Sequence, residues 1–209
     1  MKAPAGTAPV TTPLVLIVDD DEGIREALTD LLRSVGIEAR SFGSTKELLD
    51  TPTDRPGCLI LDVRLPGLSG LDLQAQLARS GNTRPIIFMT GHGDIPMSVR
   101  AMKAGAMDFL TKPFRDQDML DAVAAAIDKD KAQRQQAAAA KEVAALAATL
   151  TPRETEVMAA VVKGLMNKQI AGLLGISEIT VKLHRGNVMR KMAVRSVADL
   201  VRKAELLER

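Results

Sequence analysis

The sequence predicts a doubly wound α/β domain with a five-stranded parallel sheet, followed by a small all-α domain. Strand and helix patterns alternate five times between residues 14 and 128, which is typical of a parallel sheet covered by helices on both faces. After residue 150 only helical patterns follow. Charge divides the chain in the same way: residues 14–128 hold 12 Lys and Arg against 18 Asp and Glu, whereas residues 145–209 hold 11 against 6.

Composition excludes several classes of protein. Aromatic residues make up 2% of the chain, without Trp or Tyr, which argues against RNA modules that stack bases on aromatic side chains. A single cysteine, Cys58, excludes an internal disulfide and suits a reducing compartment. No apolar run approaches the roughly 18 residues of a spanning helix. We therefore expect a cytoplasmic protein with no membrane partner and a disordered tail over residues 1–13.

The five expected strands are apolar runs bounded by turn residues, a pattern typical of strands buried on both faces. They are Leu14–Val18, Ile37–Phe42, Cys58–Leu61, Pro85–Met89 and Asp108–Thr111. In open α/β sheets, ligands bind in the groove outside the carboxyl ends of the strands. The sequence places functional side chains at these ends, namely Asp19, Asp20, Asp62, Thr90 and Lys112.

The chemistry of these strand ends points to a cation and a phosphoryl group. Crowded carboxylates repel one another until a cation or a proton relieves them. Mg²⁺ suits such a place because it takes hard oxygen ligands and keeps several waters. A lysine opposite the carboxylates neutralises charge or holds a phosphoryl oxygen. A carboxylate such as that of Asp62 can act as the nucleophile that forms an acyl phosphate, and it needs no general base.

Residues 14–128 resemble the flavodoxin-like receiver domain of bacterial two-component response regulators, because five separated positions fit together. The resemblance implies that Asp62 is the phosphoacceptor and that a sensor histidine kinase is the phosphoryl donor. It also implies a Mg²⁺ ion bound by Asp20, Asp62 and the backbone carbonyl of Arg64, with Asp19 helping to hold it through water.

The same resemblance implies a conformational switch. Thr90 and Phe109 are the expected switch pair, and Lys112 is the expected partner of the phosphoryl group. The surface from Ile95 to Thr111 is the expected dimer face after phosphorylation. The stretch TGHGDIPMSVRAMKAGAMDFLTKPF narrows the likeness to the FixJ-like group.

Residues 129–149 are expected to form a helical linker, since they are rich in Ala, Gln and Lys, which favour helices but bury little. Such a helix serves as a rigid spacer or as a weak coiled coil. The absence of heptads of large apolar residues favours the spacer.

The second domain, residues 150–209, begins with a capping box at Thr151 and Glu154, with Pro152 at the first helical position. A second helix follows Asn167 and is expected to bury Ile170, Leu173 and Leu174. A turn through Gly175 then leads to a basic third helix from Glu178 to about Met192, and Ser196 caps a fourth helix. A short helix, a tight turn and a basic helix are typical of a helix-turn-helix.

The third helix carries the expected DNA-reading face. At 100° per residue, Val181, Val188 and Met192 lie on one side and Lys182, Leu183, Gly186 and Arg190 on the other. Lys182 reaches guanine edges or phosphate, and Leu183 reaches a thymine methyl group. Residues expected to contact the DNA backbone are Lys168, Ser177, Thr180, His184 and Arg185.

The segments LTPRETEV and NKQIAGLLGISEITVKLH resemble the LuxR-type DNA-binding domain. Gly186 departs from that pattern, because such helices usually carry a side chain there. It removes one base contact and costs roughly 1 kcal/mol of helix stability relative to Ala. Together with the receiver, this resemblance identifies the chain as a response-regulator transcription factor.

The expected function is that of a regulator rather than an enzyme. Phosphorylation of Asp62 shifts a two-state equilibrium toward a homodimer, which places two recognition helices on promoter half-sites about one DNA turn apart. RNA polymerase is a further possible partner. One alternative is a Mg²⁺-dependent phosphatase with Asp62 as turnover nucleophile, although Arg64 stands where a second acid is wanted. Another is a phosphate-independent regulator with a degenerate receiver.

Overall fold

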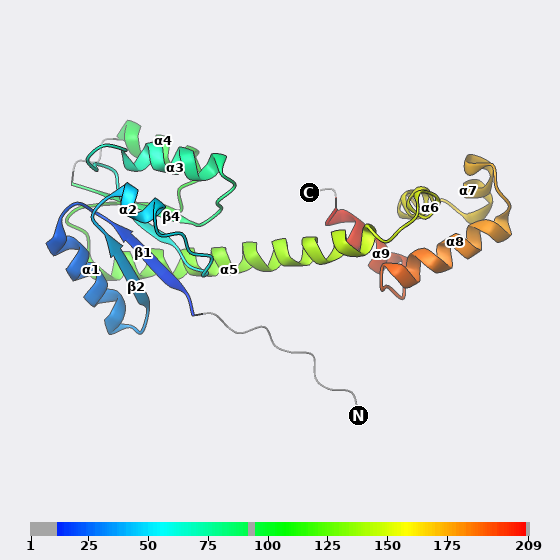
Figure 1. The fold of residues 1–209 in the computed structure, drawn as a ribbon, viewed down its shortest axis with the longest axis horizontal. Helices are drawn as coiled ribbons and strands as arrows, with labels where there is room; N and C mark the ends of the chain where they lie inside the picture. The colour runs from blue at the N-terminus through cyan, green and yellow to red at the C-terminus, as the bar shows by residue number, and fades with distance from the viewer. Residues whose placement is uncertain (1–11, 92–94, 208–209) are drawn as a thin grey trace, which may run out of the picture. The chain divides into compact units, whose positions relative to one another are not determined.

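The computed structural model describes residues 12–91 and 95–207 of the 209-residue chain. Most of the expected tail therefore lies outside the described residues, as do 92–94 of the FixJ-like stretch and 208–209 of the expected second domain. The chain forms two compact units, divided between Arg134 and Gln135. Figure 1 traces their elements in chain order.

The first unit is built on a five-stranded sheet in the order β2-β1-β3-β4-β5, with every neighbouring pair parallel. Its central strands β1, β3 and β4 are buried along their whole length, whereas β2 and β5 form the edges. The predicted doubly wound parallel sheet is thus confirmed. The strands are β1 (Leu14–Val18), β2 (Glu38–Phe42), β3 (Leu59–Asp62), β4 (Ile86–Thr90) and β5 (Asp108–Thr111).

Three strands start one residue later than expected, and two of these also end one residue later. The reason is backbone pairing: Asp62 pairs in register with Met89, and Thr90 pairs with Thr111. The two polar residues therefore close their strands instead of following them. This fixes their backbones in the sheet, right at the edge where a ligand is expected.

Alternation along the strands sends side chains to two cores, one on each face of the sheet. Leu16 and Val18 belong to the core under α2, α3 and α4, whereas Val15 and Ile17 belong to the core under α1 and α5. Figure 1 shows α3 and α4 on one side of the sheet and α1 and α5 on the other. The helices are α1 (Glu22–Ser34), α2 (Thr45–Leu49), α3 (Gly70–Arg79), α4 (Ile95–Lys103) and α5 (Asp116–Ala147).

Helix α5 contains most of the segment expected to be a linker, but both ends of that segment are packed. Near its start, Asp130 is 1% exposed and accepts hydrogen bonds from the backbone N–H of Gly57 at 2.8 Å and from Nε of Arg134 at 2.7 Å. Near its end, Val143 is buried in the core of the second unit and Leu146 packs against that core.

The second unit is all-α, as predicted, with four short helices after the end of α5. The predicted capping box is confirmed, since Thr151 and Glu154 exchange side-chain to backbone hydrogen bonds. Gly175 takes the left-handed conformation, φ 65°, that ends α7 and makes the turn of the helix-turn-helix. The helices are α6 (Pro152–Val162), α7 (Asn167–Leu174), α8 (Glu178–Lys191) and α9 (Val197–Glu205).

The expected burial of Leu173 is wrong, because its side chain is 67% exposed. Ile170 is fully buried, and Ala171 and Leu174 pack against the same core. The buried stripe of α7 therefore turns from Ile170 toward Ala171 and Leu174, which leaves Leu173 on the outer side.

Candidate functional site

The carboxyl ends of β1, β3, β4 and β5 meet around one hollow of about 450 Å³. Every strand-end residue named from the sequence lines it, and so does Arg64. Its lining residues are Asp19, Asp20, Asp21, Ile24, Asp62, Arg64, Thr90, Gly91 and Lys112.

Lys112 bridges two carboxylates in this hollow. Its Nζ donates hydrogen bonds to Oδ2 of Asp19 at 2.6 Å and to Oδ2 of Asp62 at 2.8 Å. The backbone N–H of Lys112 also donates to the carbonyl of Thr90 at 2.7 Å, which fixes the lysine beside the end of β4. The ammonium group of Lys112, after the end of β5, is therefore shared between the carboxylates at the ends of β1 and β3.

The second oxygen of each bridged carboxylate is also held. Oδ1 of Asp62 accepts from the backbone N–H of Arg64 at 3.0 Å, and Oδ1 of Asp19 accepts from the backbone N–H of Asp21 at 2.9 Å. Both carboxylates are thus oriented before any ligand arrives, which is what a nucleophile or a metal ligand requires.

Burial and charge shift the pKa values of this cluster. Burial raises the pKa of Asp19, and the hydrogen bond from Lys112 opposes that shift without cancelling it. Burial also works to lower the pKa of Lys112, but its hydrogen bonds to Asp19 and Asp62 outweigh it and raise the pKa. Lys112 therefore stays cationic, while the negative charge of Asp19 calls for further compensation.

The donor set fits a divalent cation. Asp19, Asp20 and Asp62 each offer a carboxylate oxygen, and these oxygens lie within 4.8 Å of one another. Asp20 is exposed, so a cation has access from solvent. Hard oxygen ligands at a partly open edge suit Mg²⁺. Arg64, whose carbonyl is the fourth expected ligand, lines the same hollow.

The expected switch residues lie on neighbouring strands. Thr90 is fully buried at the end of β4, within the hollow. Phe109 is partly buried on β5 and packs against the core under α4, with its ring centroid 6.4 Å from that of Phe88. The hollow and this core are thus linked through the paired strands β4 and β5.

Two contacts around the hollow were not foreseen from the sequence. Arg25 on α1 donates from Nη1 to the carbonyls of Asp19 at 2.8 Å and Asp20 at 3.1 Å. Gly70 begins α3 so close to β3 that a Cβ there would lie 2.4 Å from the carbonyl oxygen of Asp62. Neither residue belongs to a sequence pattern that predicts its contact, so only the three-dimensional approach reveals their roles.

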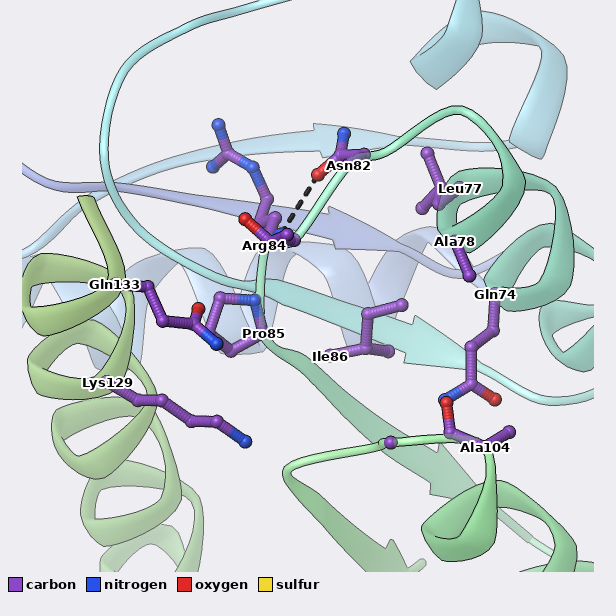
Figure 2. Close-up of a pocket in the computed structure, with 12 residues that line it drawn as sticks. Gln74, Leu77, Ala78, Asn82, Arg84, Pro85, Ile86, Ala104, Lys129 and Gln133 are labelled. Carbon is purple, nitrogen blue, oxygen red and sulfur yellow. Dashed lines mark hydrogen bonds between the residues drawn. The ribbon is translucent and has the colours of Figure 1, made fainter. Parts of the chain in front are cut away.

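A separate hollow of about 210 Å³ lies near the start of β4, shown in Figure 2. Its lining includes Arg84 and Lys129 but no carboxylate. The guanidinium of Arg84 already donates hydrogen bonds to backbone carbonyls, among them that of Arg55 at 2.6 Å. This hollow therefore lacks the groups for phosphoryl or metal chemistry that gather at the opposite strand ends.

In the second unit, α8 presents a mixed outer face. Val181 and Val188 are fully buried, whereas Lys182, Gly186 and Arg190 are exposed and Leu183 is 63% exposed. The division follows the 100° spacing of a helix.

The residues expected to contact the DNA backbone differ in exposure and in the hydrogen bonds that they already make within the protein. Lys168 is exposed on α7. Ser177 caps α8 by accepting from the backbone N–H of Thr180 at 3.1 Å. Arg185 already has a partner, since its Nη1 donates to Oδ1 of Asn167 at 2.8 Å and so ties α8 to the start of α7. His184 is partly buried.

Besides Thr151, Glu154 has a second partner that the sequence did not reveal. Its Oε2 accepts from Nζ of Lys191 at 2.6 Å, and the same Nζ donates to the carbonyl of Thr149 at 2.9 Å. The hydrogen bonds that Glu154 accepts from Lys191 and from the backbone N–H of Thr151 lower the pKa of its carboxyl group to about 2. The start of α6 thereby holds the end of α8, 37 residues away in sequence.

Two family models match the chain. The model described as response regulator receiver domain matches residues 15–124, and the model described as bacterial regulatory proteins, luxR family, matches residues 148–204. The chain belongs to the response regulators with a LuxR-type DNA-binding domain. This confirms the resemblances found in the sequence and makes the protein a transcription regulator.

Named relatives place this response regulator in the FixJ-like group. It is 57% identical to nodulation protein W of Bradyrhizobium diazoefficiens over 94% of this chain and 87% of that one. It is 46% identical to the transcriptional regulatory protein FixJ of Azorhizobium caulinodans over 92% of each chain. The solved structure of the response regulator StyR matches with a TM-score of 0.81 and 48% identity, over 93% of this chain and 98% of that one.

Membership of this family gives the receiver domain and the DNA-binding domain their general roles. Receiver domains generally bind Mg²⁺ through acidic residues and receive their signal from a histidine kinase, and LuxR-type domains bind DNA. Within residues 12–91 and 95–207, every helix is too short or too polar to cross a membrane.

Proposed function

We propose that this response regulator accepts a phosphoryl group on Asp62 from a sensor histidine kinase and then dimerises on promoter DNA. The observation that carries the proposal is the bridge from Lys112 to Asp62 and Asp19, with Asp20 beside it. It unites a nucleophile, a cation and a hard-oxygen ligand set at one edge of the sheet.

The transfer step needs positioning and charge neutralisation. An oxygen of Asp62 attacks phosphorus as the bond between phosphorus and the kinase histidine nitrogen breaks, and the nitrogen keeps the electron pair. Lys112 then moves its hydrogen bond from the carboxylate to a phosphoryl oxygen, while the N–H of Arg64 keeps Asp62 oriented. Mg²⁺, when bound by Asp19, Asp20 and Asp62, neutralises the charge that collects on the phosphoryl oxygens.

We place the kinase contact on an apolar groove of about 450 Å³ next to the acidic hollow. The groove includes Leu28, Leu31 and Phe114, and it shares Ile24 and Lys112 with the hollow. A protein that brings a phosphohistidine to Asp62 has to cover this rim. Apolar side chains there give it area to bury.

Dimerisation is proposed on α4. Three large apolar side chains on this helix are exposed: Ile95 at 79%, Val99 at 42% and Met102 at 45%. They lie at i, i+4 and i+7, which is one helix face. The strand-to-strand path from Thr90 to Phe109, whose side chain packs against the core under α4, supports a coupling between the hollow and this face.

The output is proposed to be major-groove binding by α8. The exposed Lys182 and Arg190 supply positive charge, and a two-fold dimer presents two such helices to half-sites about one turn apart.

Replacement of Asp62 by Asn tests the proposal. The wild-type chain should take up radiolabel from acetyl [³²P]phosphate only with Mg²⁺, become dimeric in light scattering, and bind promoter DNA more tightly. The Asp62→Asn variant should do none of these, whereas Asp128→Asn, an exposed carboxylate on α5, should behave as wild type. Equal labelling of Asp62→Asn and wild type would remove Asp62 from its role.

A further inference from the structure

Ile179 on α8 is 80% exposed, the largest exposed fraction among the large apolar side chains of the described residues. It is the second residue of α8 and lies in the first turn, two residues after the N-cap Ser177. A large hydrocarbon held in water at the start of a recognition helix suggests a partner that removes it from water.

Helical spacing puts Ile179 in the middle of the outer face. At 100° per residue, Ile179, Leu183, Gly186 and Arg190 fall within about 60° of one another, directly opposite the buried Val188. We call these four residues the outer stripe. Its N-terminal half is apolar and exposed, because it consists of Ile179 and Leu183, which are 80% and 63% exposed. Its C-terminal half ends in the exposed Arg190.

Charge and shape select the partner of the outer stripe. Lys182 is exposed beside the stripe and Arg190 at its end, so the partner is anionic at its margins. A Cβ built on Gly186 meets no atom within 4 Å, so internal packing does not require glycine there. The glycine instead leaves the helix backbone free to approach a surface closely. An anionic surface with hydrocarbon spots recessed between charges is the DNA major groove, where the thymine methyl is the apolar group on the base edges.

The spacing of the two apolar side chains fits neighbouring bases. Ile179 and Leu183 are four residues apart, which is about 6 Å along the helix axis. Successive base pairs rise about 3.4 Å. N-terminal residues of a recognition helix are also those that reach base edges in helix-turn-helix proteins.

We propose that Ile179 is a specificity-determining residue which, together with Leu183, reads thymine methyl groups on adjacent or next-but-one base pairs of each half-site. The inference rests on the proposed DNA-binding function and deepens it. It makes the readout of this helix largely apolar, with Lys182 and Arg190 adding charge at the margins.

The test uses full-length protein treated with acetyl phosphate and duplexes selected from a random DNA pool. Each thymine of the selected site is then replaced by deoxyuridine, which removes the methyl group and keeps the base pair. Wild type should lose roughly fourfold in affinity at two thymines per half-site, as expected for one buried methyl each. Ile179→Ala should be insensitive to one of these replacements and Leu183→Ala to the other.

Leu173→Ala is the matched control, because Leu173 is an apolar residue of α7 that is 67% exposed and lies off the outer stripe. It should keep both deoxyuridine effects. If wild type binds selected DNA but ignores every deoxyuridine, or if Ile179→Ala keeps both effects, the methyl readout by Ile179 is wrong while DNA binding stands. If no duplex is selected at all, the proposed function fails together with this inference.

Discussion

The Nζ of Lys112 lies 2.8 Å from Oδ2 of Asp62, and the same nitrogen lies 2.6 Å from Oδ2 of Asp19. Asp19 is fully buried and Asp62 is 7% exposed, so neither carboxylate is well solvated. One ammonium group therefore offsets two buried charges. The site holds a net negative charge that favours a second cation, and it depends on a single lysine.

Lys112→Met should destabilise the receiver. Removing one partner of a buried ion pair leaves uncompensated charge and typically costs about 3 kcal/mol. Urea unfolding followed by circular dichroism should show this loss for the receiver transition, and millimolar Mg²⁺ should restore part of it. Lys103→Met, on the exposed side of α4, should leave the transition unchanged. An equal effect of the two variants would contradict the bridging role of Lys112.

Glu154 should give the second unit a pH dependence. Its pKa of about 2 in the folded chain is below the ordinary value of 4.5, so its stabilisation is complete above about pH 4.5 and is lost as pH falls toward 2. Glu154→Gln should speed amide hydrogen exchange in α6 and α8 at pH 6, and the difference from wild type should shrink at pH 3. Glu156→Gln, in an exposed pair with Arg153, should show little effect at either pH.

Cys58 should be unreactive in the folded chain. It is fully buried, and burial raises the pKa of its thiol to about 12, so almost no thiolate is present at neutral pH. Labelling by a thiol reagent at pH 8 should be on the order of a thousandfold slower than in urea, because it waits for unfolding. Equal labelling rates with and without urea would show that the strand β3 opens readily.

Asp130→Ala should destabilise the receiver by roughly 2 to 3 kcal/mol, since it leaves the backbone N–H of Gly57 buried without its acceptor. Asp128→Ala is the control, because Asp128 is exposed two residues earlier on the same helix. Thermal unfolding of the two variants compares these positions directly. Similar midpoints would mean that Gly57 finds another partner.

Lys182→Ala should weaken DNA binding and reduce its dependence on salt. Loss of one phosphate contact lowers the slope of log affinity against log salt concentration by about 1, whereas loss of a guanine contact relaxes specificity and leaves the slope nearly unchanged. Fluorescence anisotropy across a range of salt concentrations separates these outcomes. An unaltered isotherm at every salt concentration would place Lys182 outside the interface.

Sequence reasoning located the acidic hollow because strand ends in a parallel sheet share one edge. The positions of Asp62 and Lys112 along the chain, together with the apolar runs before them, were sufficient for that. The contact from Arg25 to the carbonyls of Asp19 and Asp20 was not foreseen, since many arginines on helices point to solvent.

The second unit was only partly predictable, because local sequence rules reveal helix starts but not contacts between distant residues. Its helix starts follow local capping rules, so Thr151, Ser177 and Ser196 were recognised from short segments. The bond from Lys191 to Glu154 joins residues far apart in sequence, and local periodicity carries no information on such pairs. Leu173 was misassigned because the five-residue stretch IAGLL, residues 170–174, on a short helix allows two positions for the buried stripe.

The end of helix α5 has a practical consequence for isolating the DNA-binding half. Val143 is buried among residues of α6 and α8, and Leu146 packs against the same cluster. A fragment cut at Leu150 would discard these side chains along with Thr149, whose carbonyl accepts from Lys191. The residues that this domain needs for independent folding therefore begin before residue 148, where the luxR family match starts. A fragment beginning near Gln135 keeps Val143 and Leu146, whereas a shorter one leaves part of its hydrophobic core exposed to solvent.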